Sequence, residues 1–408
     1  MVPLWRGRLL ALLGILLVAL SLRTAVASIS PIIAEISASI PLDATRLGVI
    51  GMLPPLCFAV FGMLTPAIVR VLGLEISTVV MVLVITTGLV LRAAAGGYVL
   101  LLFGSVLAFA GMGAGNVLLP PLVKRYFPDR IGFVTSLYVT VVSVSTFVPP
   151  LVATPVADSA GWRVSLGMWA VLAVAAAVPW IRLLQRNGRR LDAEGVAARR
   201  MGAALRAPVW RSRTARAITL TFAVASFNAF SMFAWLPQLL QETAGMSATG
   251  AGAALSLYAA VGVPLALAVP VIATRIENVS AVIVIGVAGF VVGYLGLLLV
   301  PATLPWLWVT VAGIGPIMFP LALVLVTLRT RSHEVAGVLS GFAQGVGFLI
   351  AAMGPLLFGL LRQLSGSWTL SIVMMIAVSG VALRAAYALT RPVMVEDDVT
   401  REPDSQYR

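Results

Sequence analysis

Arg23 is the residue of this sequence best suited to bind a charged ligand. It lies about fourteen positions into an apolar run over residues 9–33, and at about 1.5 Å per helical residue this is near the middle of the run. None of the 15 acidic residues falls well inside an apolar run, so Arg23 has no counter-charge at its own depth. An unpaired guanidinium presents a planar fork of donors that fits carboxylate-like or linear anions. The alternative is structural: Arg23 donates to backbone carbonyls and only locks helices together.

Five further residues place polar groups inside apolar runs and are candidates for contact with the same ligand. Binding pockets for small molecules are mostly apolar and carry a few placed polar groups. The candidates are Asn116, Tyr138, Asn228, Tyr258 and Gln344. Asn116 has a second interpretation. Its run carries glycines at 111, 113 and 115, a pattern typical of close helix packing, so its amide can also simply bridge two helices.

Two arginine–acid pairs recur with equal spacing and predict a gate. Arg70 and Asp129 are 59 residues apart (129 − 70), and so are Arg275 and Glu334 (334 − 275). All four follow apolar runs, where loops begin. We expect the ion pairs Arg70–Asp129 and Arg275–Glu334 to close one side of the molecule in one of its conformations. The alternative is that they are solvated loop charges, which contribute about 0–1 kcal/mol when they pair.

Other kinds of chemistry have no residues to support them in this sequence. His333 is the only histidine and lies between apolar runs, so no Asp, Glu or His is placed to relay protons within a run. The sequence shows no metal-ligand cluster, nucleophile triad or nucleotide-binding loop. It therefore predicts no metal, no cofactor and no enzymatic activity. The open possibilities for coupling are facilitated diffusion, exchange, or a proton that travels with a weak-acid solute.

The elements that position these residues follow from composition. The chain has 408 residues, of which 60% are hydrophobic and 11% charged, and its mean hydropathy is +1.04. A soluble domain is closer to half apolar and a quarter charged. The composition therefore excludes a soluble enzyme. The net charge of +13 does not indicate nucleic-acid binding, because the charges lie in the gaps between apolar runs.

Twelve apolar runs are long enough to span a bilayer as helices, since about 20 residues suffice and an open strand cannot satisfy its backbone in lipid. They lie approximately at 9–33, 46–69, 74–94, 97–121, 131–156, 163–184, 214–240, 249–273, 279–299, 303–327, 336–361 and 367–389. Alternate loops differ sharply in charge. With the N-terminus inside, 23 Lys and Arg lie on the cytoplasmic side and four on the outer side. Both termini are therefore expected in the cytoplasm, and both arginine–acid pairs would close the cytoplasmic side.

The two halves of the sequence are related by a repeat. Gly113, Gly115 and Pro120 recur as Gly313, Gly315 and Pro320, and further matches keep their order with offsets of 200 to 207. We therefore expect an all-α membrane protein with two pseudo-symmetric bundles of six helices. The predicted divisions are an N-terminal bundle over 1–184, a cytoplasmic linker over 185–213, a C-terminal bundle over 214–391 and a cytoplasmic tail over 392–408.

The sequence resembles the cyanate and nitroimidazole transporter family of the major facilitator superfamily over nearly all of its transmembrane region. The matching segments are Leu22-Arg23 with Ser30-Pro31, GNVLLPPLVKRYFPDR at 115–130, TSLY at 135–138, AWLP at 234–237, LSGFAQGVG at 339–347 and GPLLFG at 354–359. Thr24 stands where the family usually has proline. The superfamily signature in the loop after the second span keeps Gly62 and Arg70 but lacks its aspartate, so the standard gating scheme is in doubt.

The resemblance implies the major facilitator fold and alternating access, with the substrate held between the bundles. It implies a small anionic or weakly acidic solute, cyanate-like or nitroimidazole-like, crossing a bacterial plasma membrane through a single chain. The alternative function is efflux of neutral or aromatic drugs, with Arg23 structural. A receptor or sensor is disfavoured, because neither linker nor tail is long enough to fold into an output domain. The expected partners are the small-molecule substrate and the lipid bilayer, with no nucleic acid.

Overall fold

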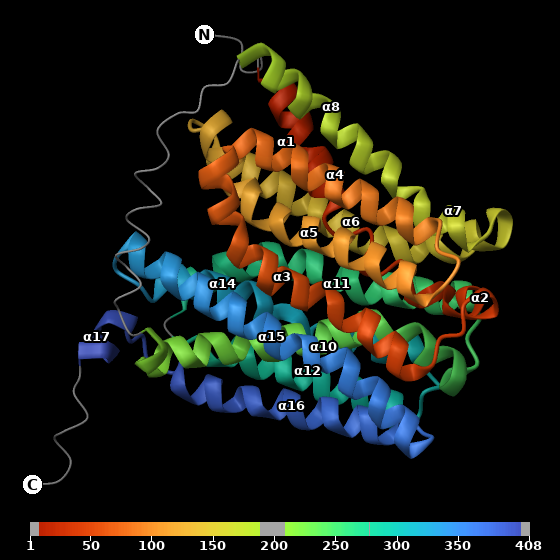
Figure 1. The fold of residues 1–408 in the computed structure, drawn as a ribbon. Coiled ribbons are helices and arrows are strands. Elements are labelled where there is room, and N and C mark those ends of the chain that lie inside the picture. The colour runs from red at the N-terminus through yellow and green to blue at the C-terminus, as the bar shows by residue number, and fades with distance from the viewer. Residues whose placement is uncertain (1–7, 188–208, 277, 401–408) are drawn as a thin grey trace, which may run out of the picture.

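The computed structural model describes residues 8–187, 209–276 and 278–400, and their regular structure is entirely helical (Figure 1). The first half contains α1 (Leu9–Ser21), η1 (Ser30–Ile32), α2 (Ile33–Ser39), α3 (Ala44–Leu72), α4 (Leu74–Ala93), α5 (Tyr98–Tyr126), α6 (Ile131–Ala160), α7 (Trp162–Gly167) and α8 (Trp169–Asn187). The second half contains η2 (Val209–Arg211), α10 (Arg213–Ala244), α11 (Ala248–Arg275), α12 (Ser280–Leu299), α13 (Pro305–Ala312), η3 (Gly315–Ile317), α14 (Met318–Leu328), α15 (His333–Ser365), α16 (Thr369–Ala388) and α17 (Val395–Thr400).

Eleven of the twelve predicted spans are helices long and apolar enough to cross a membrane, among the residues that the structure describes. Their outward faces carry bare aliphatic side chains such as Val99 and Leu364, as expected of surfaces that meet lipid rather than water. The predicted first span is different. It is interrupted over residues 22–29, so that α1 alone, with 13 residues, is too short to span.

Two spans that lose their regular helix contain a proline within a short 3-10 segment. In the first span, Pro31 lies at the start of η1 and lacks the N–H that would bond to the Ala27 carbonyl. In the tenth span, Pro316 lies within η3, between α13 and α14. The repeat partner of Pro316 is Asn116, which has an N–H, and α5 continues through it unbroken. The two halves thus share a pattern but differ in which span is interrupted.

Helices from the two halves meet in the middle of the molecule, where α3 runs beside α15 and α6 packs on α11 (Figure 1). Away from the linker these contacts are very close. A Cβ added to Gly51 of α3 would lie 2.9 Å from Cβ of Pro355, and one added to Gly252 of α11 would lie 2.6 Å from the Pro150 carbonyl oxygen. These glycines allow the helices to touch, which closes the molecule at the end far from the linker.

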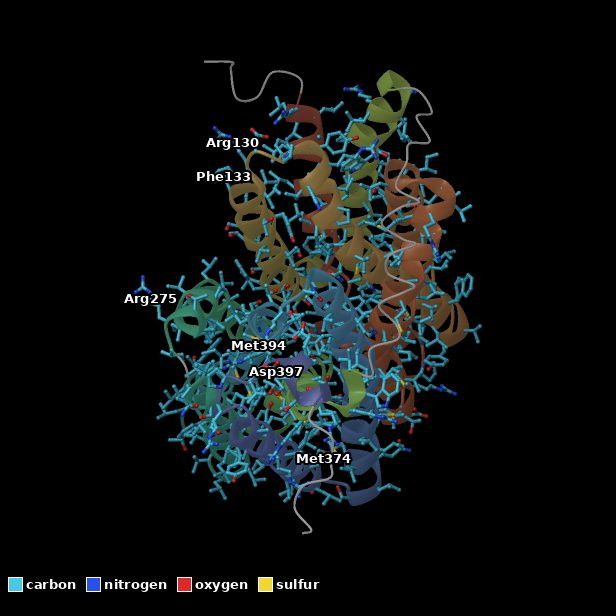
Figure 2. The ribbon with its side chains drawn as sticks, turned by 90° about the vertical axis from the view of Figure 1, so that its left-hand side faces the viewer. Arg130, Phe133, Arg275, Met374, Met394 and Asp397 are labelled. Carbon is cyan, nitrogen blue, oxygen red and sulfur yellow. The ribbon has the colours of Figure 1, made fainter. Side chains whose placement is uncertain are left out.

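The opposite end, which we call the linker end, carries α17 on its surface, as Figure 2 shows around Asp397. Asp398 accepts hydrogen bonds from the Thr214 N–H (2.8 Å) and the Ser212 hydroxyl (3.0 Å) at the start of α10. Asp397 forms an ion pair with Arg331 at 2.9 Å, just before α15. The predicted tail therefore begins with a short acidic helix held against the ends of α10 and α15.

Candidate substrate-binding cavity

A cavity of about 1650 Å³ lies between the two halves. Its walls come from the first span and from α3, α5 and α6 on one side, and from α10, α11, α14 and α15 on the other. It extends to the linker end, since its lining includes residues at that end of several elements: Arg70, Trp210, Thr274, Leu328 and Gly337. Because the far end is closed by helix contacts, the structure is open toward the linker side only.

Arg23 lies on the cavity wall, at the start of the interruption in the first span. Its guanidinium carbon lies 4.8 Å from the centre of the Phe58 ring of α3, a cation–π contact. Within the described part of the chain, its side chain forms no ion pair and no hydrogen bond to protein. The charge is thus presented to the cavity with its donors available, which is what binding of an anion requires.

Glycines of α5 bring Arg23 and Phe58 together. A Cβ at Gly113 would lie 2.9 Å from the Cys57 carbonyl oxygen, so α5 contacts the backbone of α3 next to Phe58. A Cβ at Gly115 would lie 2.4 Å from Cδ2 of Leu22, which precedes Arg23. The glycine pattern that was read from the sequence as helix packing therefore fixes two neighbours of the site.

A cluster of phenylalanines lies on the cavity wall, and sequence reasoning missed it. Phe58 contacts Phe230 and Phe348 edge-to-face, with ring centres 6.0 and 5.7 Å apart, and Phe319 packs with Phe222 at 4.9 Å. Phe58, Phe230, Phe319 and Phe348 all line the cavity. Phenylalanine carries no signal in a chain this apolar, so only the fold shows that these rings converge beside Arg23.

Three of the predicted polar residues also reach the cavity: Asn116, Tyr138 and Gln344. The Asn116 amide donates to the Met112 carbonyl of its own helix at 3.0 Å, and the Gln344 amide donates to the Ser340 hydroxyl at 2.8 Å. Each is half-buried, so these groups face the cavity while part of their hydrogen bonding is already used. Together with Arg23, these three residues place a few polar groups on an otherwise mostly apolar wall.

Asn228 and Tyr258, the other two predicted polar residues, do not line the cavity in this conformation. Asn228 is fully buried, donates to the Val224 carbonyl at 2.8 Å and accepts from the Ser379 hydroxyl at 3.1 Å, so it joins α10 to α16. Tyr258 is 2% exposed and packs edge-to-face on Phe233. Both side chains point to the interior of the C-terminal half, a direction that helical position in the sequence did not reveal.

Arg70 and Asp129, the first predicted gating pair, do not contact each other in this linker-open structure. Asp129 accepts a hydrogen bond from Arg8 at 2.5 Å, which lowers the pKa of the Asp129 carboxyl, and Arg70 lines the cavity. Arg275 points away from the body of the molecule in Figure 2. The Glu334 side chain lies outside the part of the chain that the structure describes. Both pairs therefore stay predictions for a state closed at the linker end.

Comparison with known proteins gives one family for the whole chain. The sequence profile described as Major Facilitator Superfamily matches residues 12–355. The chain is 31% identical over 368 residues to an uncharacterized transporter of Bacillus subtilis (strain 168), YycB, covering 89% of both chains. It is 28% identical to the 2-nitroimidazole transporter of Escherichia coli (strain K12), covering 90% of this chain and 92% of that one. It is 26% identical to the cyanate transport protein CynX of the same organism, covering 92% and 97%.

Solved structures show the same fold at low sequence identity. The nucleoside transporter NupG superposes with a TM-score of 0.74 at 11% identity, covering 93% of this chain and all of that one. The resemblance read from the sequence motifs, to cyanate and nitroimidazole transporters, is confirmed by the relatives found.

Proposed function

The chain belongs to the Major Facilitator Superfamily and is therefore a multi-pass membrane transporter rather than an enzyme, and from this premise we propose that it carries a small, flat, anionic or weakly acidic solute. The observation that carries the proposal is Arg23, a charge on the cavity wall that has no ion-pair or hydrogen-bond partner among the described residues and contacts the face of the Phe58 ring. The phenylalanines beside it provide faces on which a conjugated ring can stack.

The groups on the cavity wall favour one of the two kinds of solute that the names of the relatives suggest. A weak acid such as a nitroimidazole has both a delocalised charge for a guanidinium and a flat ring for the aromatic wall, whereas cyanate uses only the first. We therefore favour nitroimidazole-like solutes over cyanate-like ones. The runner-up is efflux of neutral aromatic drugs, which the same phenylalanines favour; in that case Arg23 acts only through its contact with Phe58.

We propose that the linker end faces the cytoplasm of a bacterium, in its plasma membrane, and that a single chain is the transport unit. The orientation rests on the 23 Lys and Arg in the segments on the linker side. The present structure is then the inward-facing state. Alternating access follows when the cavity closes at the linker end and the contacts of Gly51 and Gly252 separate at the far end.

The test is transport by purified protein in proteoliposomes, with radiolabelled 2-nitroimidazole and cyanate measured in parallel. Removal of a charged hydrogen-bond donor costs about 1.5–3 kcal/mol, so Arg23→Ala is expected to raise the Km for the anion at least about tenfold. Arg23→Lys keeps the charge but loses the planar fork of donors, so its Km should lie between that of the wild type and that of Arg23→Ala. Export of a neutral aromatic dye is the control and should be unchanged. If dye export collapses in Arg23→Ala while anion transport persists, the drug-efflux alternative is correct.

Charge exchange tests the proposed gate. We expect Arg70→Glu to abolish transport, because two carboxylates would then repel at the closing linker end, and Asp129→Arg in the same chain to restore it in part. Arg8 already pairs with Asp129 in the open state, so the exchange must be measured with Arg8→Gln present as well. Absence of rescue in both backgrounds rejects the Arg70–Asp129 pair.

A further inference from the structure

A second arginine, Arg92, is buried completely beside the interruption that carries Arg23. It lies in the last turn of α4 and has no exposed surface. Its Nη1 donates to the Ala25 carbonyl at 3.3 Å, while its Nε and Nη2 have no hydrogen-bond partner among the residues that the structure describes. Its guanidinium carbon lies 5.6 Å from the centre of the Phe109 ring. A buried charge with only one hydrogen bond costs folding free energy, and that bond has a consequence for the segment that it reaches.

The consequence lies in the interruption itself. Residues 22–29 lack helical hydrogen bonds, and in a membrane each unsatisfied backbone group costs several kcal/mol. Locally, the Val26 N–H closes a turn onto the Arg23 carbonyl at 3.1 Å. Arg92 binds the third residue of this turn, Ala25. In the described part of the chain, this is the one hydrogen bond that another helix gives to the interruption.

We propose that Arg92 is a positioning residue for Arg23: by holding the Ala25 carbonyl it fixes the turn 23–26 and so directs the Arg23 side chain into the cavity. Arg92 itself is not on the cavity wall. Its effect on the solute is therefore indirect. The consequence for transport rests on the proposed function of Arg23, whereas the effect on the turn can be measured without any transport.

The first measurement reads the turn directly in full-length protein in proteoliposomes. Val26 lines the cavity, and Cys57 is the only cysteine, so Val26→Cys with Cys57→Ala gives one thiol on the turn. A charged methanethiosulfonate should label this thiol at least about threefold faster or slower with Arg92→Met, and at the original rate with Arg92→Lys, which keeps a charged donor. Arg163→Met is the matched control, because Arg163 also donates to a carbonyl, Ala95 at 3.2 Å, but at the surface. An unchanged labelling rate in Arg92→Met overturns the proposal.

The second measurement is the Km for 2-nitroimidazole in the same variants. Arg92→Met is expected to raise the Km about tenfold with little change in Vmax, and Arg92→Lys to restore most of it. In the Arg23→Gln background, Arg92→Met should have no further effect, because residues that act through one another are not additive. An equal increase in Km with and without Arg23 overturns the positioning role. Failure of the wild type to transport the probe refutes the proposed function, and the labelling rate then decides the role of Arg92 alone.

Discussion

Single residues of this protein divide into those that face the cavity and those that join helices, and residue type does not separate the two. Arg23 and Asn228 both place a polar group deep in an apolar run. Arg23 faces the cavity, whereas Asn228 bonds α10 to α16 through Ser379. The sequence could predict Arg23 because an unpaired charge at mid-depth is rare. It could not assign Asn228, since an amide is equally suited to a ligand and to a neighbouring helix.

A stability measurement separates these roles. Asn228→Ala removes the bond between α10 and α16 at a fully buried position, although the Ser379 hydroxyl keeps the Met375 carbonyl as an acceptor at 2.7 Å, and should lower the free energy of unfolding by about 1–3 kcal/mol. The Km for 2-nitroimidazole should stay within about twofold. Gln344→Ala, on the cavity wall, is the contrasting variant. It should raise the Km and leave the melting temperature close to that of the wild type. The assignment of Asn228 is wrong if its variant melts normally and transports with a raised Km.

At the scale of elements, the sequence predicted the spans well because lipid demands long apolar helices. The positions at which helices are interrupted were harder to predict from the sequence. Pro316 marks one, but other prolines, such as Pro54 and Pro150, lie inside continuous helices. The interruption of the first span begins at residue 22, nine positions before Pro31 (31 − 22), and Thr24 stands there in place of proline. Whether a proline breaks or only bends a helix depends on the neighbours that take up the freed carbonyls, which sequence does not show.

The α5 glycines give a prediction at this scale. In Gly113→Ala the new Cβ would lie 2.9 Å from the Cys57 carbonyl oxygen, so α5 must move away from α3 beside Phe58. We expect a lower melting temperature and a raised Km, since the ring beneath Arg23 shifts. Gly380→Ala in α16 is the control: nothing lies within 4 Å of its Cβ, so it should melt at or slightly above the wild-type temperature. Equal behaviour of the two variants would contradict the packing role of Gly113.

The whole molecule is a repeat whose symmetry is clearest at the closed far end. Gly51 of α3 meets Pro355 of α15, and Gly252 of α11 meets Pro150 of α6; the glycines are 201 residues apart (252 − 51) and the prolines 205 (355 − 150). These offsets fall within those of the sequence repeat. The repeat thus predicted two equivalent halves. It could not predict which helices of the two halves touch, and therefore which conformational state the structure adopts.

A bulky residue at this closure should shift the conformational equilibrium. Gly252→Val places atoms against the Pro150 carbonyl and is expected to favour a state open at the far end. Spin labels at Val99 and Leu364, which are 78% and 82% exposed at that end of each half, would report a longer distance in a Cys57→Ala background. Gly262→Val on the same helix has open space around its Cβ and should leave the distance distribution unchanged. A distribution that does not move in Gly252→Val would show that these contacts do not hold the far end closed.

Arg23 is proposed to bind the negative charge of a flat solute, and the proposed substrate class depends on this contact more than on any other. The direct measurement is calorimetric titration of purified full-length protein with benzoate and with benzamide, which share a ring and differ in charge. We expect the wild type to bind benzoate at least about tenfold more tightly than benzamide, and Arg23→Gln to bind the two equally. Equal affinity of the wild type for both, or a preference for benzoate that persists in Arg23→Gln, would contradict the claim.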